Sequence, residues 1–336
     1  MNSVCIVIPC YKSGGKLEEV VNSITKISNE FLSKFIIKII VVNDSCPFKS
    51  WKDIEINSNI EIIHHKKNLG VGAATLTGFK TALEKGFDAI IKIDSDGQHP
   101  AIYLKDIIPY LLNLPKSETL LIKGSRYLYR INGEKIPWAR KIGSLFLEPI
   151  ARGALCCRDL SDISNGYIAM NNLTCKLLVE TKFGPKLKNR YLFESSLLVK
   201  TIFFNIPIHV FAMHANYGEN WNSSMNSKEM ILPLMYFWLK AGMSRLLNKY
   251  IFRLNLGTLL LFISSLSSFN SLNLFLTRIR PFVKAGITVS AGNSSYFTTS
   301  SAIAIFTLLL FFLYDYNSGI RAKSIIFPVF LEELEI

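Results

Sequence analysis

Asp94 and Asp96 stand two residues apart directly after the apolar run 87–93, and Gln98 follows them. Two carboxylates at this spacing after a strand can share one divalent cation, because Mg²⁺ or Mn²⁺ is commonly held by one or two carboxylates together with substrate phosphates. The cation would neutralise a diphosphate and make it a better leaving group. The motif therefore predicts a metal site for a nucleotide-sugar at Asp94 and Asp96, with the amide oxygen of Gln98 as a further ligand. The alternative is a turn in which an aspartate caps the next helix.

Two further polar segments follow predicted strands and could hold the rest of the nucleotide-sugar. Pro9 and Tyr11 come after the first strand and Asp44 after the second. Tyrosine could pack against a nucleobase, and aspartate could accept hydrogen bonds from a ribose. The segment from Asn68 to Gly72 precedes a predicted helix, where glycine permits a tight turn and a close approach of the backbone. It lacks the Gly-Lys-Ser/Thr ending of a P-loop.

The elements that position these residues alternate between strands and helices. Short β-branched apolar runs predict strands at residues 3–8, 35–42, 61–64, 87–93, 119–123, 165–170 and 206–212. Helical spacing of apolar residues predicts helices at 16–27, 72–85, 101–114 and 192–203. This order predicts an α/β fold with a mainly parallel sheet, covered on both faces. Ligands bind outside the carboxyl ends of such strands, where Asp44 and Asp94 lie.

The composition narrows the classes of partner. The chain has 336 residues and a net charge of +13, which suits anionic lipids or phosphate-bearing ligands. It contains no long Lys/Arg cluster, zinc-ligand spacing or RNA-binding aromatic motif, so we expect no nucleic acid partner. None of its six cysteines forms a C-x-x-C pair, which predicts free thiols in a reducing compartment. The apolar run 4–9 is too short for a signal peptide, so we expect residues 1–229 to be cytosolic.

The last third of the chain predicts a membrane region. Residues 254–277 and 285–314 contain no charged residue, and a spanning helix needs about 20 mainly apolar residues. We expect two transmembrane helices at about 254–276 and 295–315, which makes 254–336 a two-span region with a short cytosolic tail. Residues 230–253 are apolar and basic, which predicts amphipathic helices in the headgroup layer of a bilayer. The alternative is a helical hairpin buried in a soluble domain.

Two features bear on the orientation of these spans. Arg321 and Lys323 lie in the tail, where the positive-inside rule favours them. The basic residues of the loop between the spans oppose that rule, namely Arg278, Arg280 and Lys284. Either this loop lies at the interface or one stretch is re-entrant.

Five segments together resemble family 2 glycosyltransferases. They read Ile-Val-Ile-Pro-Cys-Tyr, Val-Val-Asn-Asp, Asn-Leu-Gly-Val-Gly-Ala-Ala, Asp-Ser-Asp-Gly-Gln-His-Pro and Gly-Ser-Arg-Tyr, in this order. The chain is most similar to the branch of dolichol-phosphate mannose synthases and polyprenyl-phosphate glycosyltransferases, over roughly residues 3–220. The resemblance implies a GT-A fold and inversion of the anomeric carbon. Two departures, Lys12-Ser13 after the first tyrosine and Asn43-Asp44-Ser45-Cys46 after the second strand, leave the donor open between GDP- and UDP-sugars.

The resemblance also implies roles for matching residues. The candidate catalytic residues are Asp94, Asp96, Arg126 and Glu194. The candidate nucleotide-sugar residues are Pro9, Tyr11, Asp44, Asn68, Gly72, Asp94 and Asp96. The candidate metal ligands are Asp94, Asp96 and Gln98, and the candidate acceptor-phosphate residues are Arg126, Arg140 and Ser144. His99 is close enough in sequence to the metal site to touch a phosphate.

These features predict a metal-dependent, inverting transfer of a hexose from a nucleotide-sugar to a membrane polyprenyl phosphate. A lipid phosphate is already anionic and needs no general base, so arginines would only position it. A second hypothesis is transfer to a sugar hydroxyl of a glycan or glycolipid, with Asp162 or Glu194 as the base. A third is a non-catalytic membrane scaffold on an inactive GT-A domain. A homo-oligomer is compatible with all three.

Overall fold

The computed structural model describes residues 2–31, 34–129, 138–216 and 227–332, with the backbone alone at 138–142 and 227–229. The chain divides into two compact units. The first comprises Met1–Gly153, Cys157–Trp238 and Ile320–Ile336, and the second comprises Ala154–Cys156 and Leu239–Gly319. The chain therefore leaves the first unit after Trp238 and re-enters it at Ile320.

The first unit is built on an eight-stranded sheet with the order β10-β8-β5-β7-β4-β1-β2-β3. All neighbouring strands are parallel except β7, which is antiparallel to both β4 and β5. The strand bounds are β1 (Asn2–Cys10), β2 (Phe35–Asn43), β3 (Ile60–His64), β4 (Ala89–Lys92), β5 (Leu121–Ser125), β7 (Ile168–Asn171), β8 (Ile208–Ala212) and β10 (Lys323–Ile325). The predicted α/β fold with a mainly parallel sheet is confirmed.

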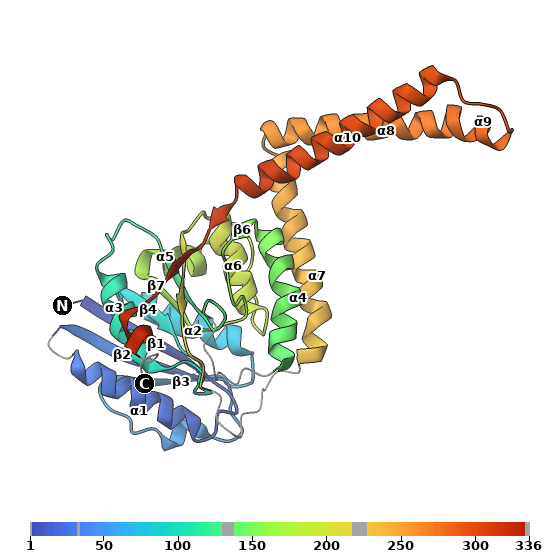
Figure 1. Cartoon of the computed structure of the whole chain (residues 1–336). Helices are drawn as coiled ribbons and strands as arrows, with labels where there is room; N and C mark the ends of the chain where they lie inside the picture. Colours follow the sequence, from blue (N-terminus) through green and yellow to red (C-terminus); the bar gives the residue numbers. More distant parts are fainter. Residues whose placement is uncertain (1, 32–33, 130–137, 217–226, 333–336) are drawn as a thin grey trace. The chain divides into compact units, whose positions relative to one another are not determined.

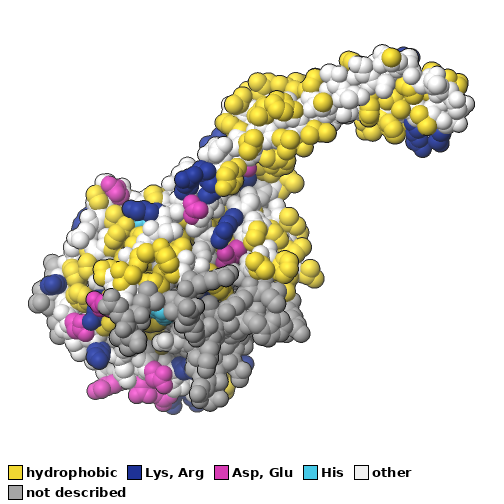
Figure 2. Space-filling view, viewed as in Figure 1, with side chains coloured by type: hydrophobic (Ala, Val, Ile, Leu, Met, Phe, Trp, Pro, Cys, Tyr) yellow, Lys and Arg dark blue, Asp and Glu magenta, His cyan; other side chains and the backbone are white. Residues whose placement is uncertain are grey.

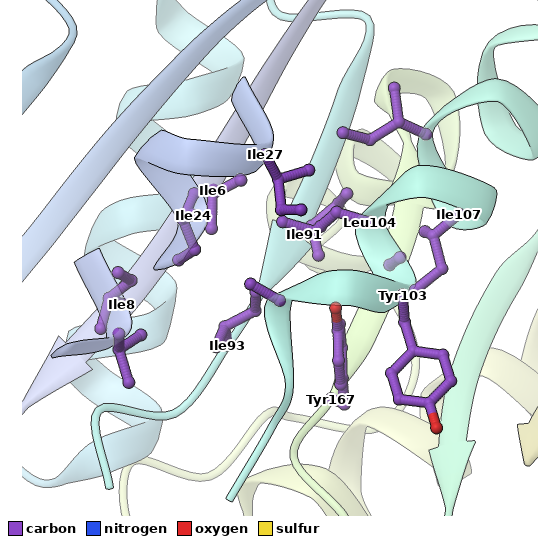
Figure 3. Packing of buried hydrophobic residues seen from close by; sticks show 14 of the residues in the cluster. Ile6, Ile8, Ile24, Ile27, Ile91, Ile93, Tyr103, Leu104, Ile107 and Tyr167 are labelled. Atoms are coloured by element: carbon purple, nitrogen blue, oxygen red, sulfur yellow. The ribbon is translucent and has the colours of Figure 1, made fainter. Parts of the chain in front are cut away.

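Helices cover both faces of this sheet, which is why β1 is buried from Val4 to Cys10. On one face, α1 (Lys16–Glu30) and α3 (Leu104–Leu112) pack on alternate residues of β1 and β4. Figure 3 shows this apolar core from close by, with Ile6 and Ile8 of β1 beside Ile24 of α1. On the other face lie α2 (Val71–Glu84), α5 (Asn172–Glu180) and α6 (Phe193–Phe203), as Figure 1 shows. A side chain at Gly78 of α2 would collide with Val7, so this glycine lets the helix approach β1 closely.

The C-terminal residues differ from the predicted short tail. β10 extends the sheet by pairing with β8, and β9 (Ile320–Arg321) pairs with β6 (Cys157–Arg158). The short helix α11 (Pro328–Glu332) follows, and Phe327 and Phe330 are buried in the core. Strands of two or three residues leave too short a pattern to be recognised in the sequence. Their partners also lie far away along the chain.

The second unit contains two long apolar helices that pack side by side, α8 (Leu256–Leu274) and α10 (Ala291–Asn317). A π-helical turn, η4 (Phe275–Ile279), and the short helix α9 (Arg280–Lys284) connect them. Leu256–Lys284 and Ala291–Asn317 are both long and apolar enough to cross a membrane. Most of the buried residues of the two helices are small, among them Ser264, Ser271, Ser300 and Ala304. Ser264 Oγ donates to Ala304 O at 2.9 Å, and Ser300 Oγ donates to Ser267 O at 2.8 Å.

The outer surface of this hairpin is apolar and exposed, as Figure 2 shows. Only 11% of the most apolar part of the first helix and 22% of that of the second are buried. A hairpin in the core of a soluble domain would bury most of these side chains. The exposure of these side chains therefore argues against a hairpin buried in a soluble domain.

The helix before the hairpin, α7 (Ser227–Leu246), joins the two units. In the second unit, Arg245 donates from Nη1 and Nη2 to the two carboxylate oxygens of Asp315, both at 2.7 Å. Lys249 Nζ and Tyr250 Oη also donate to Asp315 Oδ1, at 3.3 Å and 2.6 Å. Two basic residues of the predicted amphipathic region 230–253, Arg245 and Lys249, therefore bind the end of α10. The reason is that Asp315, a charge at the end of an apolar helix, needs partners.

Candidate active site

A cavity of ≈ 340 Å³ lies at the carboxyl ends of β1 and β4. Eight of the predicted site residues line it, namely Pro9, Tyr11, Asp44, Asp94, Asp96, Arg126, Ser144 and Glu194. Asn68, Gly72 and Gln98 are not among its lining residues. The side chain of Arg140 lies outside the described residues. The fold thus brings together residues that are up to 185 positions apart, from Pro9 to Glu194.

A fully buried lysine that the sequence analysis missed holds two of these carboxylates. Lys92 Nζ lies 2.6 Å from Asp94 Oδ1 and 3.1 Å from Glu194 Oε1, and it donates to Gly166 O at 3.2 Å. Burial alone would lower the pKa of Lys92, but the two carboxylates raise it, so the ammonium stays charged. Glu194 therefore pairs with Lys92. The sequence feature that could have identified Lys92 is a charged residue at the end of an otherwise apolar strand, β4.

Asp94 is an ionised carboxylate in this arrangement. Burial raises its pKa, but the surrounding positive groups, with Lys92 first among them, together bring the pKa to about 2. A side chain at Gly166 would collide with Asp94 Oδ2 and Lys92 Nζ. Glycine at this position therefore allows the loop before β7 to close over the ion pair.

Asp96 is held by the residue that we predicted as a metal ligand. Gln98 Nε2 donates to Asp96 Oδ2 at 2.6 Å, and the backbone N–H of Gln98 donates to Asp96 Oδ1 at 3.1 Å. Gln98 is buried and turns its amide nitrogen toward Asp96, so it orients this carboxylate and does not reach the cavity as a ligand. The turn between them needs glycine, since Gly97 has φ +79°.

The carboxylate oxygens of Asp94 and Asp96 fit a cation that binds together with a diphosphate. Among the described residues, no group of three or more His, Cys, Asp or Glu side chains could hold a metal ion. Asp94 and Asp96 both line the cavity, and two carboxylates are sufficient for Mg²⁺ or Mn²⁺ when phosphates and water supply the other oxygens. The site suits a metal that arrives with its substrate.

His99 has a structural part in this motif and does not line the cavity. Its Nδ1 accepts a hydrogen bond from the backbone N–H of Asp94 at 3.1 Å, and its ring lies 5.2 Å from that of Tyr167. Burial lowers its pKa to about 4, so the ring is neutral at physiological pH. His99 therefore fixes the backbone at Asp94, and the expectation that it touches a phosphate is wrong for this geometry.

Arg126 is held by a buried carboxylate. Its Nε and Nη2 donate to Asp162 Oδ2 and Oδ1, both at 2.7 Å, and its backbone N–H donates to Asp162 Oδ2 at 3.0 Å. Burial raises the pKa of Asp162. The nearby positive charges, with Arg126 first among them, lower it, and the resulting pKa is about 2. A carboxylate with so low a pKa is a poor general base. Glu148 Oε1 extends the network by accepting from Ser144 Oγ at 2.7 Å and from the backbone of Asp162 at 2.9 Å.

Asp44 orders the turn that contains the glycine motif. Its Oδ1 accepts from the backbone N–H of Leu69 and its Oδ2 from that of Gly70, both at 2.8 Å. Gly70 has φ +100°, and a side chain at Gly72 would collide with the backbone at Lys188. The glycines therefore let α2 pack closely against the segment before α6.

Residues 5–172 of the chain match the family described as Glycosyl transferase family 2. The chain belongs to this family. It is 28% identical over 193 residues to the UDP-N-acetylglucosamine–dolichyl-phosphate N-acetylglucosaminyltransferase of Methanococcus voltae, covering 53% of this chain and 72% of that protein. It is 32% identical over 142 residues to the undecaprenyl-phosphate mannosyltransferase of Micrococcus luteus, covering 39% of this chain and 53% of that protein. Among solved structures, mannosyl-3-phosphoglycerate synthase from Rubrobacter xylanophilus aligns over 76% of this chain and 77% of its own, with 13% identity and a TM-score of 0.47.

The expected glycosyltransferase activity and GT-A type of fold are thereby confirmed.

The cavity of this family 2 glycosyltransferase also has an apolar part that the sequence analysis did not include. Leu147 of α4 (Trp138–Leu155) contributes to it, with Met230, Ile231, Leu234 and Trp238 of α7. The same two helices expose large apolar side chains, among them Leu145, Phe146, Leu232 and Tyr236. Polar groups for a nucleotide-sugar and apolar surface thus meet in one cavity.

Proposed function

We propose that this glycosyltransferase moves a hexose from a metal-bound GDP- or UDP-sugar to a polyprenyl phosphate, with inversion at the anomeric carbon. The observation that carries the proposal is the composition of one cavity. Asp94, Asp96 and Arg126 line it together with apolar residues of α7, as a substrate with a phosphate and a hydrocarbon chain requires. The names of the two relatives, which specify dolichyl and undecaprenyl phosphate, support the acceptor class.

On the donor side, the residues would bind and orient a nucleoside diphosphate. When bound at Asp94 and Asp96, Mg²⁺ or Mn²⁺ would neutralise the diphosphate as it leaves. Lys92 keeps Asp94 ionised and fixed for that purpose. Pro9 and Tyr11 line the cavity where the nucleoside would lie.

On the acceptor side, the carboxylates near the cavity favour a phosphate nucleophile over a hydroxyl. A hydroxyl acceptor needs a general base. Asp162 is bound by Arg126 and Glu194 by Lys92, so both proposed bases are engaged in ion pairs. A phosphate oxygen is already anionic and needs only to be positioned. Arg126, with one edge of its guanidinium fixed on Asp162, would do this from a rigid geometry.

The path of the chain supports a two-span membrane topology. Residues on both sides of the hairpin belong to the first unit, and β10 is part of its sheet. A hairpin that spans the bilayer would therefore cross it an even number of times, with the first unit and β10 on one side, proposed to be the cytosol. The 27 residues of α10 extend about 40 Å at 1.5 Å per residue, which is enough for a hydrocarbon core of about 30 Å.

An assay on membranes that contain the protein tests this function. The membranes are incubated with labelled UDP- and GDP-sugars, a polyprenyl phosphate, and Mg²⁺ or Mn²⁺. We expect labelled lipid that is lost with Asp96→Ala and retained with Asp53→Ala, a matched change at an exposed aspartate. Transfer to a glycan alone would support the hydroxyl acceptor. Absence of both transfer and nucleotide binding would support the scaffold.

A further inference from the structure

A second cavity lies on the helical face of the sheet formed by α2, α5 and α6, and none of its residues belongs to the first cavity. Leu76 and Lys80 of α2 line it, with Lys200 of α6. The remaining lining residues come from the end of α5 and the loop after it, and they are Val179, Thr181, Lys182, Pro185, Lys186 and Leu187. Four of the nine lining residues are lysines and none is acidic.

These four lysines have no acidic partner in the described part of the chain. Among the residues that the structure describes, no ion pair involves Lys80, Lys182, Lys186 or Lys200. By contrast, Lys85, which directly follows the last residue of α2, pairs with Glu61. Four like charges around one cavity repel each other, and an anion bound between them would relieve that repulsion.

Lys200 gives the cavity a buried positive charge. The residue is only 4% exposed, and its ammonium group donates to Thr181 O at 2.8 Å. An ammonium group has three N–H donors, and this is the single hydrogen bond that it makes with the described residues. Burial without a carboxylate also lowers the pKa of Lys200. A buried ammonium with unused donors is costly unless a ligand satisfies it.

We propose that this lysine cavity, between α2, α6 and the loop after α5, is a binding site for a phosphate-bearing ligand. Phosphate offers several acceptor oxygens to the ammonium donors, and its charge suits the unpaired lysines. The apolar side chains of Leu76 and Leu187 would lie against the organic part of such a ligand. The ligand is either a soluble phosphate compound or the headgroup of an anionic lipid.

Lysine footprinting of the full-length protein in nanodiscs of neutral lipid tests the proposal. The protein is acetylated with an N-hydroxysuccinimide ester, and the rate at each lysine is measured by mass spectrometry with and without inorganic pyrophosphate. EDTA is present, so that the metal-dependent site at Asp94 and Asp96 does not take up the probe. We expect acetylation of Lys80, Lys182 and Lys186 to slow by about tenfold when pyrophosphate is at about ten times its Kd, since only the free fraction then reacts. Lys176, an exposed lysine of α5 outside the cavity, should be unaffected.

A second arm replaces pyrophosphate by nanodiscs that contain phosphatidylglycerol. Protection in this arm alone would assign the ligand to a lipid headgroup, and protection by pyrophosphate alone would assign it to a soluble phosphate. No protection in either arm would overturn the proposal, as would equal protection of Lys176.

Two variants test the lysines themselves. Lys200→Met should weaken pyrophosphate binding by about tenfold, because a charged hydrogen bond is lost. Lys182→Gln/Lys186→Gln changes only exposed side chains, so it tests the site even if Lys200→Met fails to fold. Unchanged protection of Lys80 in this double variant would contradict the proposal. The result is independent of transferase activity, since binding is measured without donor or acceptor.

Discussion

Lys92 Nζ lies 2.6 Å from Asp94 Oδ1, and the same ammonium group reaches Glu194 Oε1 at 3.1 Å. One buried cation thus joins a carboxylate of the motif after β4 to a carboxylate in the first turn of α6. The two acids are 100 residues apart, from position 94 to 194, and both line the first cavity. Lys92 is therefore a positioning residue for the proposed donor site.

Replacing Lys92 should destabilise the protein because it leaves two carboxylates without their cation. We expect Lys92→Met to lower the free energy of unfolding by about 3 kcal/mol, the typical cost of breaking a buried ion pair. Urea unfolding of the purified protein measures this. The double variant Lys92→Met/Glu194→Gln should recover part of the loss, since one of the two unpaired charges is removed. Equal stability of the two variants would show that Glu194 does not depend on Lys92.

Arg126 should be sensitive even to a conservative change. Lysine keeps the charge but cannot make the two parallel hydrogen bonds that Arg126 makes with Asp162. We expect Arg126→Lys to raise the KM for polyprenyl phosphate by about tenfold, the loss from one misplaced charged hydrogen bond. The KM for the nucleotide-sugar should change little. A larger effect on the donor than on the acceptor would contradict the proposed role.

Gly72 should be intolerant of even a methyl group. A Cβ at this position would lie 2.8 Å from Phe193 Cβ and would collide with the carbonyl of Lys188. Gly72→Ala should therefore destabilise the protein by about 1–3 kcal/mol, as overpacking commonly does. Gly153→Ala is the matched control, since it lies in α4 with no atom within 4 Å of the added Cβ. Thermal unfolding of both variants tests the prediction, and an equal Tm for the two would refute it.

Asp162 should make stability depend on pH in the acid range. Arg126 lowers its folded pKa from 3.8 to about 2 in spite of burial, so between these values the unfolded chain binds more protons than the folded one. The contribution of the Asp162 carboxylate to the free energy of unfolding is present above pH 3.8 and is lost as the pH falls toward 2. Asp162→Asn should be less stable than the wild type at pH 6, and the difference should shrink near pH 2. Urea midpoints at several pH values test this, and a difference that does not vary with pH would exclude the mechanism.

The hairpin should expose its loop on the side of the membrane opposite the catalytic sheet. The six cysteines are buried, so a membrane-impermeant maleimide should react mainly with introduced ones. We expect Thr288→Cys to be labelled from one side of sealed vesicles, and Asp53→Cys and Glu332→Cys from the other. Labelling of all three from one side would mean that the hairpin does not cross the bilayer.

Several features could be predicted from the sequence because their signals are local. A buried parallel strand is a short β-branched run, and the Asp94-Ser95-Asp96 motif follows such a run directly. Burial of β1 on both faces and the apolar hairpin helices α8 and α10 follow from the same reasoning, since each is encoded by consecutive residues. The family resemblance also rested on short local motifs, and the match of residues 5–172 confirms it.

Only the tertiary structure decided which partners these residues have. Gln98 turns to Asp96, Asp162 holds Arg126, and Lys92 joins Asp94 to Glu194. The pairing of β10 with β8 after the hairpin was likewise decided by the tertiary structure. A periodic pattern reports which side of an element is buried, but it contains no information on what packs against that side. Pairings across many residues depend on strand order and loop paths, and these are set by the packing of the whole chain.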